Sequence, residues 1–115
     1  MFDICYINRL KLVEIARLCF QNDYYHAGIY VPNERTFKNV VDDLLQITYL
    51  PNFRRLRRNT KTNYDFLFNN GSSITIAIPS DGCRGHRMHT LVADPDIDSY
   101  TLDTLVRPYE IEYIK

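Results

Sequence analysis

The stretch 69–95, NNGSSITIAIPSDGCRGHRMHTLVADP, decides which fold the chain is expected to adopt. Its Asn-Gly pair supplies the positive φ that a two-residue hairpin turn needs, between the apolar segment 64–68 and the segment 73–78. Isoleucines alternate with small or polar residues in 73–78, which is typical of a strand with one buried face. A polar loop then leads to the apolar segment 88–93, so the stretch predicts a hairpin, a loop and a buried strand that ends at Asp94.

Upstream of the hairpin, helices and strands are expected to alternate. Apolar residues recur at three- and four-residue spacing in 10–22 and in 34–47, which predicts two amphipathic helices. The apolar run 28–31 between them predicts a buried strand, and Asn33 is placed to cap the second helix. That helix is expected to bury one stripe of apolar side chains: Phe37, Val40, Val41, Leu44 and Leu45. A strand, a short loop and a helix in this order indicate the α/β class.

The two ends of the chain complete the expected elements. The segment 99–106 predicts a short helix with Ser99 as its cap, and 110–114 predicts a last strand. Near the N-terminus, residues 2–7 are expected to pair as a first strand. This set of strands leaves sheet edges open, which predicts a homo-oligomer or a bound partner that covers an edge.

Length and composition restrict the class of protein. A chain of 115 residues suits one domain, 1–115, with a modest core. Basic and acidic residues are equal in number, 14 each, which argues against a polyanion-binding surface over the whole molecule. No apolar run approaches the roughly 20 residues that span a bilayer, and no signal peptide is recognised. Three widely spaced cysteines do not suggest a disulfide framework, so a cytoplasmic protein without membrane partners is expected.

Asp94 and Arg84 are the candidates for chemistry at a phosphate site. An apolar strand that ends in an aspartate can present its carboxylate to Mg²⁺, although many strands end in aspartate without binding metal. Arg84, followed by Gly85, could reach a phosphate or a neighbouring subunit. A solvated loop arginine beside a turn glycine is the simpler interpretation of this pair.

Two other clusters each have a plain structural alternative. The spacing of Cys83, His86 and His89, with Asp81 nearby, invites comparison with a zinc site, but no fourth ligand with familiar spacing follows, so no metal is expected. A basic cluster could hold a phosphate backbone, although such a run is more often a solvated turn or hairpin arm. Its members are Arg54, Arg55, Arg57, Arg58 and Lys61.

The order of these pieces resembles the ATPase domain of the large terminase subunit of tailed bacteriophages, the motor that packages DNA. The segments KLVEIARLCF, GIYVPNERTFKNVVDDL, FLFNNGSSI, RGHRMHTLVAD and IDSYTLDTLVRPY carry the resemblance, which covers about residues 10–110. It implies a truncated P-loop NTPase-like α/β fold, a three-layer core with a β-hairpin insertion, without the nuclease domain of the family. A sheet with strands 28–31 and 88–93 parallel in its core would agree with this relation, whereas an antiparallel meander would not.

The departures from the family decide the expected activity. The phosphate-binding motif G-x-x-x-x-G-K-[ST] is absent. Under the resemblance, Lys11 stands where the phosphate-binding lysine should be, but Leu10 and Leu12 replace its glycine and Ser/Thr neighbours. Asp94 matches the metal-site acid, whereas Pro95 replaces the glutamate that would orient the attacking water. The resemblance therefore implies that ATP hydrolysis has been lost.

We expect a viral, terminase-like protein without ATP hydrolysis in the cytoplasm of an infected host cell. It would act as a binding, regulatory or scaffold module, for example in DNA packaging, and no cofactor is expected. Its partner would be another protein or a second copy of the chain, and DNA is a further candidate. The residues expected to bind a partner or nucleic acid are Arg54, Arg55, Arg57, Arg58, Lys61, Arg84 and Arg87.

Two alternatives stay open. The chain could be one piece of a split packaging ATPase that is completed by the phosphate loop of another chain, or one in which Lys11 and Asp94 still act on ATP and Mg²⁺ in an unusual site. Arg84 is the third degenerate catalytic candidate. It could instead be a small viral interaction protein that inhibits a host or defence system.

Overall fold

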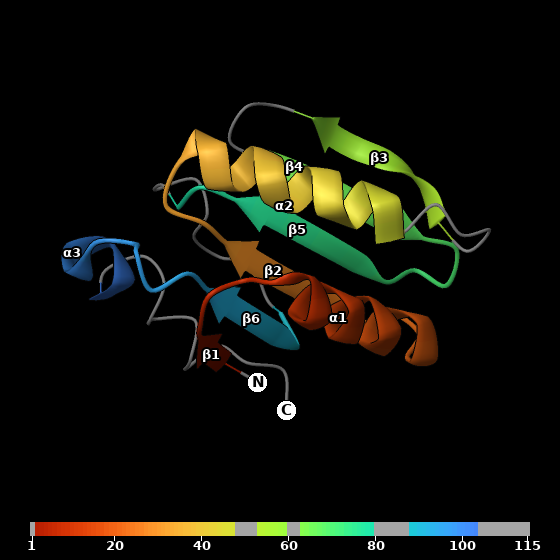
Figure 1. Ribbon diagram of the computed structural model, residues 1–115. Coiled ribbons are helices and arrows are strands. Elements are labelled where there is room, and N and C mark those ends of the chain that lie inside the picture. Colours follow the sequence, from red (N-terminus) through yellow and green to blue (C-terminus); the bar gives the residue numbers. More distant parts are fainter. Residues whose placement is uncertain (1, 48–52, 60–62, 80–87, 104–115) are drawn as a thin grey trace.

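Within the residues that the structure describes, one mixed, six-stranded sheet forms the centre of the domain (Figure 1). The computed structural model describes residues 2–47, 53–59, 63–79 and 88–103. Within them the strands are β1 (Phe2–Ile4), β2 (His26–Tyr30), β3 (Phe53–Asn59), β4 (Asn63–Phe68), β5 (Ser73–Ala77) and β6 (Thr90–Ala93), and the helices are α1 (Arg9–Gln21), α2 (Glu34–Ile47) and α3 (Ser99–Thr101). The predicted α/β class, both long helices and both hairpin strands are therefore confirmed.

The strands follow the order β1-β6-β2-β5-β4-β3 across the sheet. The first four of these run parallel, whereas β4 and β3 are added antiparallel. β2 pairs with β6 in the middle of the sheet, so that Ile29 lies opposite Val92. A parallel sheet with 28–31 and 88–93 in its core, the arrangement that would agree with the resemblance, is found at this pair. The short β1 pairs parallel with β6, which also confirms a first strand near the N-terminus.

The β4–β5 hairpin is part of the main sheet, so the expectation of a hairpin insertion is wrong. β5 pairs along its whole length with β2, from His26 opposite Ser73 to Tyr30 opposite Ala77. Alternating isoleucines give β5 one face for the core, and both of its edges are used, one by β2 and one by β4. The hairpin therefore extends the sheet.

The hairpin loop holds three residues, 69–71, instead of the predicted two. Phe68 donates its N–H to the carbonyl of Ser72 over 2.9 Å and accepts a bond from the N–H of Gly71 over 3.2 Å. Gly71 has a φ of 84°, the left-handed conformation that glycine adopts without steric cost. A three-residue loop that ends in a left-handed glycine is a common hairpin geometry, and the Asn-Gly signal fits it as well as the shorter turn.

Helices α1 and α2 lie side by side on one face of the sheet (Figure 1). Their apolar stripes pack on the alternating side chains of the strands and form the main core. The helices contribute Leu12, Ile15, Ala16, Cys19, Phe37, Val40, Val41 and Leu44, and the central strands contribute Ala27, Ile29, Phe66, Ile74, Ile76 and Val92. Leu45, expected in this stripe, is instead 41% exposed, because it lies at the border of the buried face of α2.

The opposite face of the sheet carries a second, smaller core. Within the described residues, Met88, Ile97 and Leu102 pack there against Tyr30 and other strand residues. Gly28 allows this close approach, because a Cβ atom at this position would lie 2.0 Å from the sulfur of Met88. A helical third layer, as the resemblance implied, is not among the residues that the structure describes.

The end of the described chain corrects one predicted cap. Asp98, not Ser99, caps α3, since its Oδ2 accepts a hydrogen bond from the N–H of Thr101 over 3.1 Å. The predicted helix 99–106 is described only as far as residue 103, and the predicted strand 110–114 lies outside the described residues. No helix in the described part of the chain is long and apolar enough to cross a membrane.

Candidate functional site

The carboxyl ends of β1, β6, β2 and β5 meet along one side of the sheet, which we call the carboxyl edge (Figure 1). In α/β proteins this edge is where ligands bind. Lys11 lies there because α1 follows β1, and Asp94 lies there because it follows β6. A cavity of about 190 Å³ opens at the same edge, among the segments that follow β2, β5 and β6, and it is lined by Pro32, Ile78, Pro79, Asp96, Ile97, Asp98 and Thr101. The structure thus brings two of the predicted site residues to the expected edge.

The side chain of Lys11 forms an ion pair with a residue of strand β1. Its Nζ lies 3.2 Å from Oδ2 of Asp3, the one ion pair between residues that the structure describes. Burial alone would lower the pKa of Lys11, but the hydrogen bond to Asp3 and the charge of Glu14 outweigh it and raise the pKa. The ammonium group is therefore held in its charged form against β1.

The start of α1 is closed by its own cap. Oδ1 of Asn8 accepts a hydrogen bond from the N–H of Lys11 over 2.8 Å, and the Asn8 carbonyl accepts one from Leu12 over 3.1 Å. Only residues 5–8 connect β1 to α1, and none of them is glycine. A phosphate cradle needs several backbone N–H groups that point at the anion, and this connection is too short to form one.

Asp94 is used to form a turn. It is only 5% exposed, and its Oδ1 accepts a hydrogen bond from the N–H of Asp96 over 2.8 Å. Its carbonyl also accepts a bond from Ile97 over 3.2 Å, around a turn in which Pro95 holds the second position. Aspartate before proline is a favoured start for such a turn. The carboxylate therefore has a structural role that accounts for its position without a metal.

Tyr6 and Asp96 join the segments that follow β1 and β6. The hydroxyl of Tyr6 donates to Oδ1 of Asp96 over 3.1 Å. This hydrogen bond, followed by the charge of Asp96, raises the pKa of Tyr6. Tyr6 was not predicted as a site residue, although its place two residues after the end of β1 was a usable signal.

Cys5 lies close to both Lys11 and Asp94. Burial, followed by the negative charge of Asp3, raises the pKa of the thiol, while Lys11 opposes this and Asp94 adds to it. Within the described residues, no hydrogen bond joins Lys11 to Asp94, because the ammonium group of Lys11 is bonded to Asp3. Among the described residues, the two candidates therefore share an edge, and no ion pair or hydrogen bond joins them.

Several predicted site residues fall outside the described part of the chain. These are Lys61, Asp81, Cys83, Arg84, His86 and Arg87. The basic residues Arg54, Arg55, Arg57 and Arg58 belong to β3, whose backbone pairs antiparallel with β4. The interpretation of this cluster as a hairpin arm is thereby confirmed for its backbone, and its binding of DNA stays a prediction.

A histidine pair lies at the opposite end of β2 and β6. Nδ1 of His89, the third residue of the zinc pattern, accepts a hydrogen bond from the N–H of His26 over 3.1 Å, and its ring stacks on Tyr25 at 5.0 Å. Nδ1 of His26 lies 2.8 Å from the hydroxyl oxygen of Ser73. Within the described residues, no three His, Cys, Asp or Glu side chains gather as a metal site. The two histidines are thus held by hydrogen bonds at the amino ends of the strands.

His26 should make the stability of the fold depend on pH. Burial, and then the charge of His89, lowers its pKa, so the folded state favours the neutral ring. Its contribution to stability is then full above the ordinary histidine pKa of about 6.5 and is lost as the pH falls below that value. We expect the urea midpoint to fall between about pH 7.5 and pH 5.5. In His26→Gln the fall should be clearly smaller, and an equal fall in both proteins would contradict the assignment.

Comparisons with protein-family models, with curated proteins and with solved structures found no match for this chain. The terminase resemblance therefore remains a prediction that rests on the order and spacing of motifs.

Proposed function

We propose that the chain is a viral, terminase-like module that binds a protein partner and does not hydrolyse ATP. One observation supports the statement that the chain does not hydrolyse ATP. The groups that would have to hold a nucleotide are engaged by neighbouring residues: Lys11 by Asp3, the first turn of α1 by Asn8, and Asp94 by the backbone of Asp96. A nucleotide would have to displace all three sets of contacts.

The arrangement of the sheet supports descent from a P-loop NTPase-like core. β1 leads into the helix that carries Lys11, and β6 leads to Asp94. The two strands are adjacent and parallel, and β2 follows on the other side of β6. This places the start of a lysine-bearing helix and the aspartate that ends a strand at one edge, as a nucleotide site of this class requires.

Exposed apolar side chains at the carboxyl edge support the partner-binding role. Tyr6 is 64% exposed, Leu10 81% and Tyr100 77%. They come from the two segments that follow the neighbouring strands β1 and β6, and from the start of α1. Single exposed apolar residues are ordinary, but several at one functional edge are typical of a protein interface. We propose that a phage or host protein covers this edge where the ancestral motor held ATP.

A calorimetric titration with ATP and Mg²⁺ tests this proposal, and we expect no saturable heat. A second candidate, the split packaging ATPase, is favoured by the presence of Lys11 and Asp94 at the same edge, where both act on Cys5. It predicts the opposite result in the same titration once the completing chain is present.

A further inference from the structure

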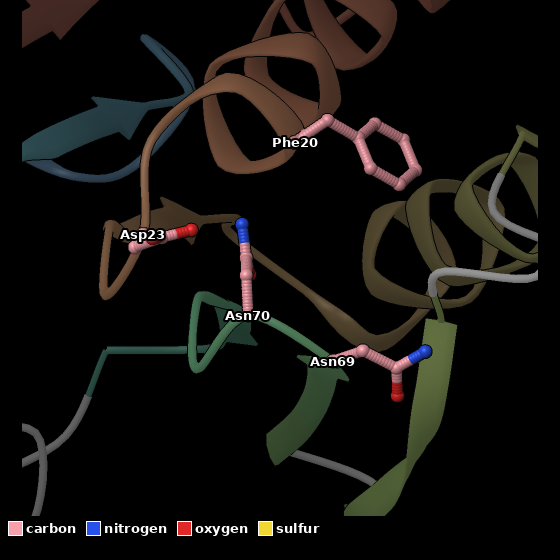
Figure 2. Close-up of a pocket in the computed structure, with 4 residues that line it drawn as sticks. All are labelled: Phe20, Asp23, Asn69 and Asn70. Atoms are coloured by element: carbon pink, nitrogen blue, oxygen red, sulfur yellow. The ribbon is translucent and has the colours of Figure 1, made fainter.

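A second cavity lies at the other end of the parallel strands, away from the carboxyl edge. Its volume is about 310 Å³, and it is lined by Phe20, Asp23, Asn69 and Asn70 (Figure 2). These residues come from the end of α1, from the connection to β2 and from the hairpin tip. The volume is at the lower end of the range of about 300–1,000 Å³ for ligand pockets, so it suits one small group.

The wall of the cavity is held rigidly by Asn70. Its amide nitrogen donates to the carbonyl of Cys19 over 2.7 Å and to that of Asn22 over 3.3 Å. Its Oδ1 accepts a hydrogen bond from the N–H of Ser72 over 3.0 Å. The buried hydroxyl of Ser72 adds a further bond to the Asn22 carbonyl over 2.6 Å. The hairpin tip and the end of α1 therefore form one preorganised unit.

Tyr24 closes the same unit in a strained conformation. Its φ of 55° makes it the one non-glycine residue with positive φ in the described chain. Its N–H donates to the Asn70 carbonyl over 3.2 Å, and its ring lies so close to Gly71 that a Cβ there would be 2.5 Å away. Such strain persists only where surrounding contacts impose it, and it is concentrated at functional sites.

The electrostatics of the cavity favour a cation. The C-terminus of a helix carries a partial negative charge, which a basic residue in the last turn commonly offsets. The last turn of α1 has no basic residue, and Asp23 follows the capping residue Asn22. Within the described residues, Asp23 takes part in no ion pair. The local sequence thus concentrates negative charge where helix physics disfavours it, which is the kind of conflict expected at a binding site.

We propose that this cavity binds the guanidinium group of an arginine, either free or as a side chain of a protein. The Asp23 carboxylate can accept two parallel hydrogen bonds from the planar group. The Phe20 ring on the cavity wall offers a surface for its weakly hydrated face. Asn69, whose amide also lines the cavity, supplies a polar rim (Figure 2). This site is independent of the nucleotide question, because it lies at the amino ends of the strands.

The test is an NMR titration of the ¹⁵N-labelled full chain with N-acetyl-arginine amide, which imitates an arginine within a protein. We expect saturable shifts centred on Phe20, Asp23 and the hairpin tip. N-acetyl-citrulline amide, which has the same shape without the charge, should give no saturable shift. Free L-arginine separates the two sources, because tighter binding of the free amino acid would assign the site to a small molecule and equal or weaker binding to a protein side chain.

Asp23→Asn is the decisive variant, since Asp23 is exposed and its replacement should leave the fold intact. We expect it to weaken binding by about tenfold or more. The matched control is Asp42→Asn, an exposed carboxylate on α2, for which the affinity should be unchanged. The proposal is overturned by undiminished binding to Asp23→Asn, by equal shifts with citrulline, by shifts centred elsewhere, or by no saturable shift with either arginine probe.

Discussion

Replacement of Leu12 by alanine is expected to lower the free energy of unfolding by about 2–5 kcal/mol. Leu12 is 0% exposed and packs in the main core between α1 and the sheet. Its loss removes buried apolar surface and leaves a cavity that the surrounding side chains cannot fill. In a domain of this size, such a change consumes a large part of the total stability. Under the terminase resemblance, which remains a prediction, this position corresponds to the Ser or Thr that ligates Mg²⁺.

The matched control is Leu10→Ala, two residues away on the same helix. Leu10 is 81% exposed, and its replacement should change the free energy of unfolding by no more than about 0.5 kcal/mol. Urea unfolding followed by circular dichroism measures both variants. An equal decrease in the free energy of unfolding for Leu10→Ala and Leu12→Ala would show that α1 does not pack on the sheet through Leu12.

Replacement of Asn70 by alanine should cost roughly 2–3 kcal/mol, because each internal hydrogen bond contributes about 1 kcal/mol and buried partners are left unpaired. The side chain makes three hydrogen bonds, to the carbonyls of Cys19 and Asn22 and from the N–H of Ser72. These bonds join the hairpin to the end of α1, and the two segments are distant in sequence. The loss should therefore appear as a lower urea midpoint for the whole domain, and not only as fraying of the hairpin.

Asn69→Ala provides the comparison for this second variant. Asn69 is exposed, so water can replace what its side chain loses, and a cost below about 1 kcal/mol is expected. A loss at Asn70 no larger than the loss at Asn69 would contradict the role given to the Asn70 bonds. Hydrogen exchange at the Ser72 amide would locate the effect.

Much of the fold could be predicted from local patterns. The period of apolar residues identified α1 and α2, and the isoleucine alternation identified β5 with its buried face. The Asn-Gly signal identified the hairpin but not its loop length, because a left-handed glycine serves both a two-residue and a three-residue loop. The place of the hairpin within the sheet could not be predicted, since the pairing of β5 with β2 depends on contacts between distant segments.

The candidate site was less predictable than the fold. Sequence spacing brought Lys11 and Asp94 to one edge, but it could not reveal their partners. Asp3 comes from a strand of only three residues, and the turn that engages Asp94 depends on the backbone of Asp96. No sequence motif predicted the cavity beside Asp23. It is formed by residues about 50 positions apart, and their contact depends on the tertiary fold.

Whether the purified chain binds ATP with Mg²⁺ tests the proposed loss of the nucleotide site. Isothermal titration should give no saturable heat across the roughly micromolar to millimolar range in which enzymes hold their substrates. Lys11→Ala and Asp94→Ala should behave as the wild type does in this experiment. Saturable micromolar binding that either variant abolishes would contradict the account, because it would show that Lys11 leaves Asp3 and that Asp94 opens its turn to form a working nucleotide site.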